Sequence, residues 1–578
     1  MTGSTYILGI HDGHNSGATL ICDGSIVASV NEERLSRRKN EVGYPERSIA
    51  EVLRIGGIDG NDLKEVVYAS LFMHKSDYLS DLEPWYRVGL SDQRAAEARP
   101  KGYQNVIFET RKQERIDQVC LQLGVPADRV DFVEHHLAHL AAAYYTAPRR
   151  SKNRSYLGLT CDGAGDGLCA TVSVCEGNRI ERLATTDRHS SLGKIYSRVT
   201  FLMGMTPWEH EYKLMGLAPY ADAEYADRAA DVFRNMLRLR VDGLGFERTG
   251  ELSMNYCYEH LRDSFERTRF DIIAGAAQVF TEEMLVDWVR SCISKTGIRD
   301  LVCGGGVFMN VKANMLIAQL PELRSIYVMP SAADESLSIG CALHKYYQST
   351  GGIDHTASVL KDLYLGGEAS LTEEKSAVET ARSQAQLEVC EPQDMNGTIS
   401  ELLAQGEIVA SCRGRMEWGA RALGNRSILS SAEDYRRVDK INQAIKMRDF
   451  WMPFAPSIRS DAAERYFSDP KNQKPWFMTF SFPTKPDTYD HLVAGSHPRD
   501  RSIRPQVVTR EGNADYYDVI SGFEERTGRG VVLNTSFNLH GEPIVNSPSE
   551  AIDVLCRSGL EVLALNNFLL QKPASAKV

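Results

Sequence analysis

The sequence predicts a two-domain α/β protein whose first domain is a duplicated unit. Three observations carry this prediction: the length of 578 residues, two similar hairpin segments about 150 residues apart, and a second half in which basic residues accompany glycine turns. Because one hydrophobic core does not support a chain of this length, at least two domains are expected. We place the boundary in a polar Gly, Ser and Thr stretch, which gives domains of residues 1–355 and 356–578.

The duplication rests on residues 6–30 and 156–185. Each segment predicts a strand, an Asp-Gly turn, a second strand, a turn of Cys, an acidic residue and Gly, and a third strand. Asp12 corresponds to Asp162, and Cys22 corresponds to Cys175. Chance alternation explains either segment alone, but both together indicate a repeat. This plan resembles the superfold of actin, chaperones and sugar kinases, in which two such hairpins hold nucleotide phosphates with backbone N–H groups.

Composition and charge exclude several classes of protein. The formal net charge of -11 argues against nucleic acid as a partner, although a local basic pocket for a small anion remains compatible with it. The N-terminus has no basic region before an apolar run, and no stretch reaches about 18 apolar residues, so neither secretion nor a membrane span is expected. The twelve cysteines form no CxxC pair, which fits buried thiols in a reducing compartment. A cytoplasmic enzyme is therefore expected.

An Ala-rich helix is predicted over residues 133–146. His135 and His139 are four residues apart, on one helical face and close enough to share a metal ion. His136 points about 100° away from them. The alternative is a pair of packed histidines without a metal, since two imidazoles need a third ligand from elsewhere.

Two further segments predict a strand, a turn and a helix. In residues 301–314 the glycines Gly304, Gly305 and Gly306 precede a helix N-terminus, which favours an anion, and Asn310 is placed to reach a ribose or base. Such a turn is common in α/β proteins, so it is a weak signal by itself. In residues 327–343 Asp334 lies near a helix start, where a carboxylate is also a plain N-cap. Two imidazoles and this carboxylate would suit Fe(II), or alternatively Mn(II) or Zn(II).

The motifs EHHLAH, DGAGDG, CGGGVFMN and PSAADES occur in this order. Their order and spacing resemble the metal-dependent enzyme that threonylcarbamoylates adenosine in tRNA, and resemble still more the N-terminal domain of the NodU/CmcH family of O-carbamoyltransferases, as does EYKLMGLAPY at 211–220. The resemblance implies that His135, His139 and Asp334 hold a metal. It also implies that Asp162, Gly163 and the glycine turn at 304–306 face a nucleotide.

The second domain carries basic residues next to glycines, aromatic residues and small polar residues. These residue types suit a polyanion such as a triphosphate or carbamoyl phosphate. The resemblance implies a site for ATP and carbamoyl phosphate here, and its candidate residues are Arg415, Arg421, Lys446, Arg448, Arg504, Asn534, Ser536 and Asn538. The alternative is a set of solvated surface charges, each contributing little. The neighbouring Trp418, Phe450, Trp451 and Phe454 argue against that alternative.

Lys446 and Arg448 with Ser536 and Asn538 resemble the KxR…SxN pattern of YrdC-like domains, which make carbamoyl-type adenylates. GRMEWGARALGNRSIL, FWMPFAPSI and LNTSFNLHGEPIV are similar to the C-terminal half of the NodU/CmcH family. The resemblance thus covers nearly the whole chain. One departure is Met452, where some members carry Arg; Arg501 is a candidate replacement for that contact.

The resemblance implies a reaction in two steps. Carbamoyl phosphate and ATP, with its Mg²⁺, would yield carbamoyl-adenylate in the second domain, where Lys446, Arg448 and Arg504 neutralise phosphate charge. In the first domain a divalent metal would polarise the carbamoyl group for attack by a small-molecule hydroxyl. Asp12, His14, Asp162 and Lys39 are candidate general bases by position only, and Lys39 is better suited to contact substrate or phosphate because an ordinary Lys is protonated at neutral pH.

Two other readings of the sequence remain. One is a tRNA-modifying threonylcarbamoyl transferase, which the negative net charge of the chain disfavours. The other is a non-catalytic nucleotide-binding regulator. The acceptor is not predicted, because family members act on antibiotics, sugars, Nod factors and alkaloid-like metabolites. Residues 72–115 are the expected acceptor loop, with Tyr78, Trp85 and Tyr103 available for stacking. A homodimer is the default assembly.

Overall fold

The computed structural model describes residues 4–73, 83–99, 103–148, 154–350, 356–384 and 387–573. They form two compact units, each described separately below. Unit 1 comprises Met1–Glu32 and Asn40–Leu360, and unit 2 comprises Glu33–Lys39 and Lys361–Val578. The predicted boundary at 355 falls in a segment outside the described residues. The inclusion of the short segment Glu33–Lys39 in unit 2 was not predicted.

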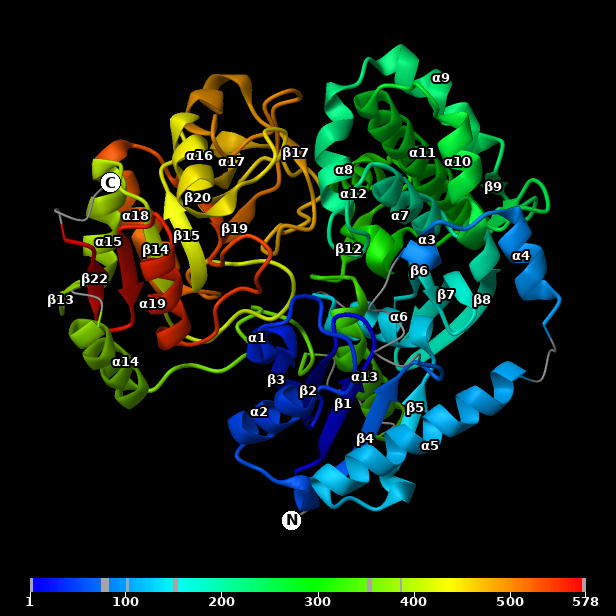
Figure 1. Ribbon diagram of the computed structural model, residues 1–578, viewed down its shortest axis with the longest axis horizontal. Helices are drawn as coiled ribbons and strands as arrows, with labels where there is room; N and C mark the ends of the chain where they lie inside the picture. Colours follow the sequence, from blue (N-terminus) through cyan, green and yellow to red (C-terminus); the bar gives the residue numbers. More distant parts are fainter. Residues whose placement is uncertain are drawn as a thin grey trace. The chain divides into compact units, whose positions relative to one another are not determined.

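The first sheet of unit 1 contains five strands in the order β3-β2-β1-β4-β5 (Figure 1). The strands are β1 (Tyr6–His11), β2 (Gly17–Cys22), β3 (Ser25–Asn31), β4 (Leu63–Ala69) and β5 (Val130–Val133). β1, β2 and β3 pair antiparallel, as the hairpin pattern predicts, while β4 and β5 add in parallel beside β1. Asp23 and Gly24 both have positive φ angles (48° and 84°), the geometry of a tight two-residue hairpin turn.

The second sheet repeats this order as β8-β7-β6-β11-β12. Its strands are β6 (Tyr156–Gly165), β7 (Leu168–Glu176), β8 (Arg179–Asp187), β11 (Asp300–Gly304) and β12 (Ser325–Val328). Again three strands pair antiparallel and two add in parallel. The repetition of one strand order and pairing pattern confirms the predicted duplication and the actin and sugar-kinase plan.

The Asp-Gly turns of both copies differ from the prediction. β1 and β2 are joined by residues 12–16, where Asn15 has a positive φ angle (58°) and Asp12 and Gly13 do not. The hairpin between β6 and β7 turns at Asp166 and Gly167, with φ angles of 48° and 84°, instead of at Asp162 and Gly163. The pairing register shifts between Cys161 and Gly165, so the strand continues irregularly past Asp162. An irregular strand of this kind redirects a side chain, and here the redirected side chain is that of Asp162.

Two helices lie against the sheets of unit 1 and against each other: α6 (His135–Thr146) follows β5, and α13 (Leu337–Thr350) follows β12. α6 packs on β6 and β11, whereas α13 packs on β1, β2 and β4. Small side chains permit the close approach, since a Cβ at Gly340 would lie 1.8 Å from the backbone oxygen of Ala138. The two helices start where the parallel strands end, so their N-terminal residues meet in one region.

The remaining helices of unit 1 complete its two halves. α2 (Glu46–Gly56) covers β2 and β3, and α11 (Phe270–Thr296) packs on α9 (Ala223–Arg234), α8 (Glu211–Leu217), α7 (Leu192–Leu202) and α12 (Val311–Gln319). The 21-residue helix α5 (Tyr103–Leu123) precedes β5.

Unit 2 contains a mixed eight-stranded sheet with the order β13-β22-β21-β14-β15-β20-β16-β19. Its strands are β13 (Glu388–Cys390), β14 (Val409–Cys412), β15 (Arg426–Ser430), β16 (Ala455–Arg459), β19 (Gln506–Val508), β20 (Val531–Ser536), β21 (Val562–Leu565) and β22 (Leu569–Gln571). Helices α15 (Met395–Gln405) and α18 (Ala514–Thr527) pack together and bury Ile399, Leu403, Val519 and Phe523 with the sheet. Helices α14 (Leu371–Gln384) and α19 (Pro548–Arg557) form a second pair. The predicted α/β class of this half is confirmed.

Candidate metal centre and anion-binding site

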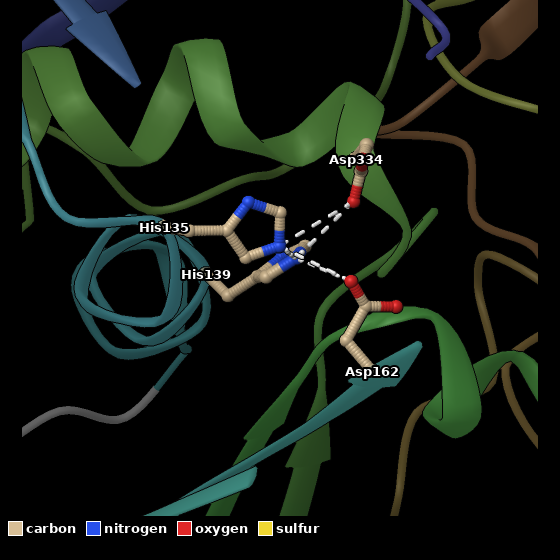
Figure 2. A group of neighbouring side chains, drawn as sticks. All are labelled: His135, His139, Asp162 and Asp334. Atoms are coloured by element: carbon tan, nitrogen blue, oxygen red, sulfur yellow. Dashed lines mark hydrogen bonds and ion pairs between the residues drawn. The ribbon is translucent and has the colours of Figure 1, made fainter. Parts of the chain in front are cut away.

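Four side chains in unit 1 converge on one point: His135, His139, Asp162 and Asp334 (Figure 2). One ligand atom of each lies within 4.8 Å of the others. The Nε2 atoms of the two histidines are 3.1 Å apart, and Asp162 Oδ2 lies 3.1 Å from His135 Nε2. Asp334 Oδ1 lies 3.4 Å from His139 Nε2. Both histidines are buried, so the four groups share a confined space.

Each ligand is placed by the local structure already described. The histidines lie one helical turn apart at the start of α6, as predicted. Asp162 is on the irregular part of β6, and Asp334 begins a 3₁₀ turn directly before α13. His136 turns away, and its Nδ1 pairs with Thr160 Oγ1 at 2.9 Å.

Hydroxyl groups orient both imidazoles. His135 Nδ1 is 2.9 Å from Ser70 Oγ, and His139 Nδ1 is 3.2 Å from Ser336 Oγ. Because Nδ1 is engaged in each ring, Nε2 is the nitrogen that faces the cluster. Metal-binding histidines show this arrangement, in which the second ring nitrogen is held by an outer partner.

The charges of the cluster also favour a cation. Burial lowers the pKa of His135, but the carboxylates of Asp334 and Asp162 outweigh it and raise the pKa to about 9. Burial raises the pKa of Asp162, yet hydrogen bonds with His135 and His139 bring it well below its ordinary value. Two half-buried carboxylates beside two buried imidazoles thus favour a positive charge, and a divalent ion held by all four side chains would supply it. The residues present therefore fit a metal.

The structure brings together the three predicted ligands and adds Asp162, which the sequence placed at a nucleotide or in catalysis. The signal available for Asp162 was its position in the second Asp-Gly motif, but the hairpin turn expected there lies four residues later. Ser70 and Ser336 were missed. Ser336 ends the PSAADES motif, two positions after Asp334, and could have been found there, whereas nothing in the sequence context of Ser70 distinguishes it from other serines.

The glycine turn packs against this cluster. A Cβ at Gly304 would lie 2.7 Å from the backbone oxygen of His139, and one at Gly305 (φ 97°) would lie 2.4 Å from that of Cys161. The backbone N–H of Gly306 donates to Asp162 Oδ1 at 3.2 Å. These glycines therefore allow β11 to approach α6 and β6, whatever else they bind.

Two other residues predicted at the nucleotide lie nearby. Asn310 caps α12 by accepting from Ala313 N, and its amide exchanges hydrogen bonds with that of Gln278. Gly163 is open to its surroundings, with its carbonyl accepting from Ser191 Oγ at 2.7 Å. Their roles at a nucleotide stay predictions.

Asp12, predicted as catalytic, is buried in an ion pair with Arg115. Arg115 Nη2 donates to Asp12 Oδ1 at 2.9 Å, and Nε lies 2.9 Å from Oδ2. Both carboxylate oxygens thus face one guanidinium. His14, the neighbouring candidate, packs against Trp208 with ring centroids 5.2 Å apart.

Two titratable groups near the cluster were not singled out in the sequence. Burial, with the charge of Arg198, lowers the pKa of Lys194 to about 8, and a Cβ at Gly163 would lie 3.7 Å from its Nζ. Burial raises the pKa of Glu211 to about 7. Glu211 is the first residue of the EYKLMGLAPY motif. This motif was identified from the sequence, but its carboxylate was not singled out.

In unit 2 the KxR…SxN residues do come together. Lys446 is buried, and its Nζ donates to Asn538 Oδ1 at 2.7 Å, Ser536 Oγ at 3.1 Å and Asn538 O at 3.2 Å. It ends a short π-helical segment, Asn442–Lys446, and Met447 follows with a φ of 46°. Burial, with the charges of Arg448 and Lys39, holds the pKa of Lys446 well below its ordinary value.

Other residues predicted for this site have different surroundings. Arg448 Nη2 donates to Thr535 Oγ1 at 3.1 Å, next to Ser536. Arg415 donates to the carbonyls of Leu365 and Gly366. The buried amide of Asn534 lies within 3.1 Å of Ala422 O, Ser457 Oγ and Gln506 Oε1, which indicates a structural role. Arg421 and Arg504 are half-buried in loops of unit 2, and Met452 is buried.

The segment Glu33–Lys39 brings residues from the N-terminal part of the sequence into unit 2. The buried Arg34 donates to Gly419 O at 2.6 Å, and Arg37 donates to Ile544 O at 2.7 Å. Lys39 follows, and its charge acts on Lys446. This placement supports the expectation that Lys39 contacts an anion, since it lies with the cations of unit 2.

The predicted acceptor loop is described only in part. Tyr78 lies outside the described residues, as does the side chain of Tyr103. Trp85 is on α3 (Glu83–Tyr86), where its carbonyl accepts from Arg198. In the part of the chain that the structure describes, no helix has the length and apolarity needed to cross a bilayer.

Two family profiles match this chain: the carbamoyltransferase N-terminus over residues 6–343 and the carbamoyltransferase C-terminus over residues 400–572. An uncharacterized protein of Synechocystis is 30% identical over 99% of this chain and 97% of its own length. Nodulation protein NolNO of Sinorhizobium fredii is 29% identical over 97% of this chain and 79% of its own length. The 3'-hydroxymethylcephem-O-carbamoyltransferase of Amycolatopsis lactamdurans is 29% identical over 60% of this chain and 62% of its own length.

Proposed function

The chain belongs to the carbamoyltransferase family, and from that premise we propose that it is an ATP-dependent O-carbamoyltransferase acting on a hydroxyl group of a small molecule. One relative is named for O-carbamoylation of a hydroxymethylcephem, and others are nodulation proteins. The net charge of -11 fits a small-molecule acceptor better than a nucleic acid. An acceptor among natural products or sugars is therefore favoured.

Unit 2 would carry out the activation step, because it holds the buried cation Lys446, whose hydrogen bonds within the described ranges go to neutral oxygens. Carbamoyl phosphate first loses its phosphate to water, leaving carbamate. A carbamate oxygen then attacks the α-phosphorus of ATP, which gives carbamoyl-adenylate and pyrophosphate. Lys446 and Arg448 would neutralise phosphate charge in both reactions, and Lys39 adds a third positive charge.

Unit 1 would carry out the transfer step. The acceptor oxygen attacks the carbamoyl carbon, the bond from that carbon to the AMP oxygen breaks, and the hydroxyl proton passes to a base. Lys194 and Glu211, whose pKa values lie near neutrality, are candidates for the base along with His14. A divalent metal held by His135, His139, Asp162 and Asp334, with Fe(II) as the first candidate, would act as a Lewis acid toward the carbamoyl oxygen.

The observation that carries this proposal is that the buried ammonium of Lys446 donates to the neutral oxygens of Ser536 and Asn538. It is tested by pyrophosphate release from ATP, carbamoyl phosphate and Mg²⁺, using wild type, Lys446→Ala and His135→Ala. We expect release that requires carbamoyl phosphate, is abolished by Lys446→Ala and persists in His135→Ala. Pyrophosphate release that does not require carbamoyl phosphate would contradict the proposal. Release that is lost in His135→Ala but kept in Lys446→Ala would contradict the assignment of activation to unit 2 and transfer to unit 1.

A further inference from the structure

Ser70, the hydroxyl partner of His135, has an unusual backbone conformation. It follows β4 with a φ of 73°, in the left-handed region that serine rarely occupies. Such a conformation is retained only where surrounding contacts hold it. Here Ser70 N donates to Val133 O at 2.8 Å, and Ser70 O accepts from Arg115 Nη1 at 2.9 Å.

Arg115 holds this turn from inside the protein. It lies on α5 and is 3% exposed, and its guanidinium packs over the rings of Tyr68 and Phe132. Besides Ser70 O it donates to Ala69 O at 3.1 Å. A buried guanidinium requires a negative partner, and Asp12 supplies it.

The contacts therefore form a continuous series: Asp12 to Arg115, Arg115 to the backbone of Ser70, and Ser70 Oγ to His135 Nδ1. We propose that Asp12, Arg115 and Ser70 are positioning residues that orient His135 in the metal centre, and that Asp12 acts through Arg115 instead of accepting a proton. The inference rests on the proposed metal site. It concerns the geometry of the ligand and not its titration.

A matched control is provided by His136, which is on the same helix as His135 and has its own hydroxyl partner, Thr160 of β6. Thr160 Oγ1 lies 2.9 Å from Nδ1 of His136, the same distance that separates Ser70 Oγ from Nδ1 of His135. Both hydroxyls are buried and each contacts one imidazole, but His136 is outside the ligand cluster. Thr160→Val thus removes the hydroxyl partner of His136, together with the hydrogen bond of 2.6 Å between Thr160 Oγ1 and Thr171 Oγ1, without replacing a ligand.

The experiment measures Co²⁺ affinity of the full-length protein by competition with a chromophoric chelator, together with the visible spectrum of bound Co²⁺ and the thermal midpoint. We expect Ser70→Ala and Arg115→Lys to weaken Co²⁺ binding by about 10- to 100-fold and to alter the spectrum, as outer partners of metal ligands do. Asp12→Asn should weaken binding in the same direction. Thr160→Val should retain both affinity and spectrum, even if it lowers the thermal midpoint.

Equal affinity and spectra in wild type, Ser70→Ala and Arg115→Lys would overturn the inference while leaving the metal centre in place. Weakening in Thr160→Val as large as in Ser70→Ala would also overturn it, because affinity would then follow general packing. A wild-type protein that binds no Co²⁺ would remove the metal centre itself, and the inference with it.

Discussion

Replacing Lys446 with Met should strongly slow the activation step without destabilising unit 2. Lys446 is 3% exposed, and the three hydrogen bonds of its ammonium go to neutral oxygens of Ser536 and Asn538. Among the described residues it has no ion pair. A bound anion would compensate the positive charge that a protonated Lys446 places in this buried position.

The contacts of Lys446 set the expected size of the change in activity and of the change in stability. Loss of a charge-assisted hydrogen bond to phosphate costs about 2–3 kcal/mol, which corresponds to roughly a 30- to 150-fold fall in kcat/KM for carbamoyl-phosphate-dependent pyrophosphate release. Replacing a buried charge by a hydrophobic side chain is often neutral or stabilising by about 1–4 kcal/mol. Asn538 O loses a donor, at a cost of about 1 kcal/mol, while Asn538 Oδ1 retains Ser536 Oγ. The thermal midpoint should consequently stay the same or rise.

Arg426 supplies the contrasting variant. It is equally buried, but it donates to the carbonyls of Arg413, Gly414 and Asn546 and so serves the fold. Arg426→Met should lower stability by about 3 kcal/mol, because several buried carbonyls lose their donor. If Lys446→Met loses as much thermal stability as Arg426→Met, or keeps wild-type pyrophosphate release, the interpretation of Lys446 as an anion-binding cation is refuted.

Three further predictions concern unit 1. Asp162→Asn should lower metal affinity by more than about 100-fold, because losing a ligand exceeds the loss of an outer partner; unchanged metal content after dialysis would place Asp162 at the nucleotide instead. Gly305→Ala should lower the free energy of unfolding by at least about 2 kcal/mol, since the φ angle of Gly305 is 97° and an added Cβ would meet Cys161 O. Gly297 has a φ angle of 70° but open space around it, so Gly297→Ala should lower the free energy of unfolding by about 1 kcal/mol. Equal shifts of the thermal midpoint in the two variants would contradict this prediction. Burial lowers the pKa of His344 to about 4, below the value of 6.5 in the unfolded chain, so protonation of the unfolded state lowers the free energy of unfolding by about 2 kcal/mol between pH 7.5 and pH 5. His344→Gln should therefore narrow the difference between the thermal midpoints at these two pH values. An unchanged difference would contradict the lowered pKa of His344.

The architecture of unit 1 was accessible from the sequence because local signals specify it. Alternating apolar residues and Asp-Gly turns indicated the hairpins, and the four-residue spacing of His135 and His139 placed both on one helical face. Asp334 was placed by a strand-turn-helix pattern. These features depend on neighbours in the chain, so periodicity and turn chemistry reveal them.

The remaining features of the site depend on contacts between distant residues. The irregularity that turns Asp162 inward is a matter of strand register, which the sequence of a single strand does not specify. Arg115 meets Asp12 across 103 positions in the chain, and Ser70 meets His135 across 65. The attachment of Glu33–Lys39 to unit 2 likewise depends on buried arginine contacts, whose partners the sequence does not indicate.

The two copies within unit 1 use equivalent positions for different purposes. Asp12 and Asp162 occupy matching positions in the two copies, Asp12 directly after β1 and Asp162 in the irregular part of β6. Asp12 neutralises an arginine, whereas Asp162 faces the metal cluster. The helix after the fifth strand supplies two imidazoles in one copy, whereas a carboxylate precedes it in the other. A symmetric homodimer of a single copy would have to place the same residue at both positions. Because both copies lie in one chain, each can carry a different residue at the equivalent position, as this centre does.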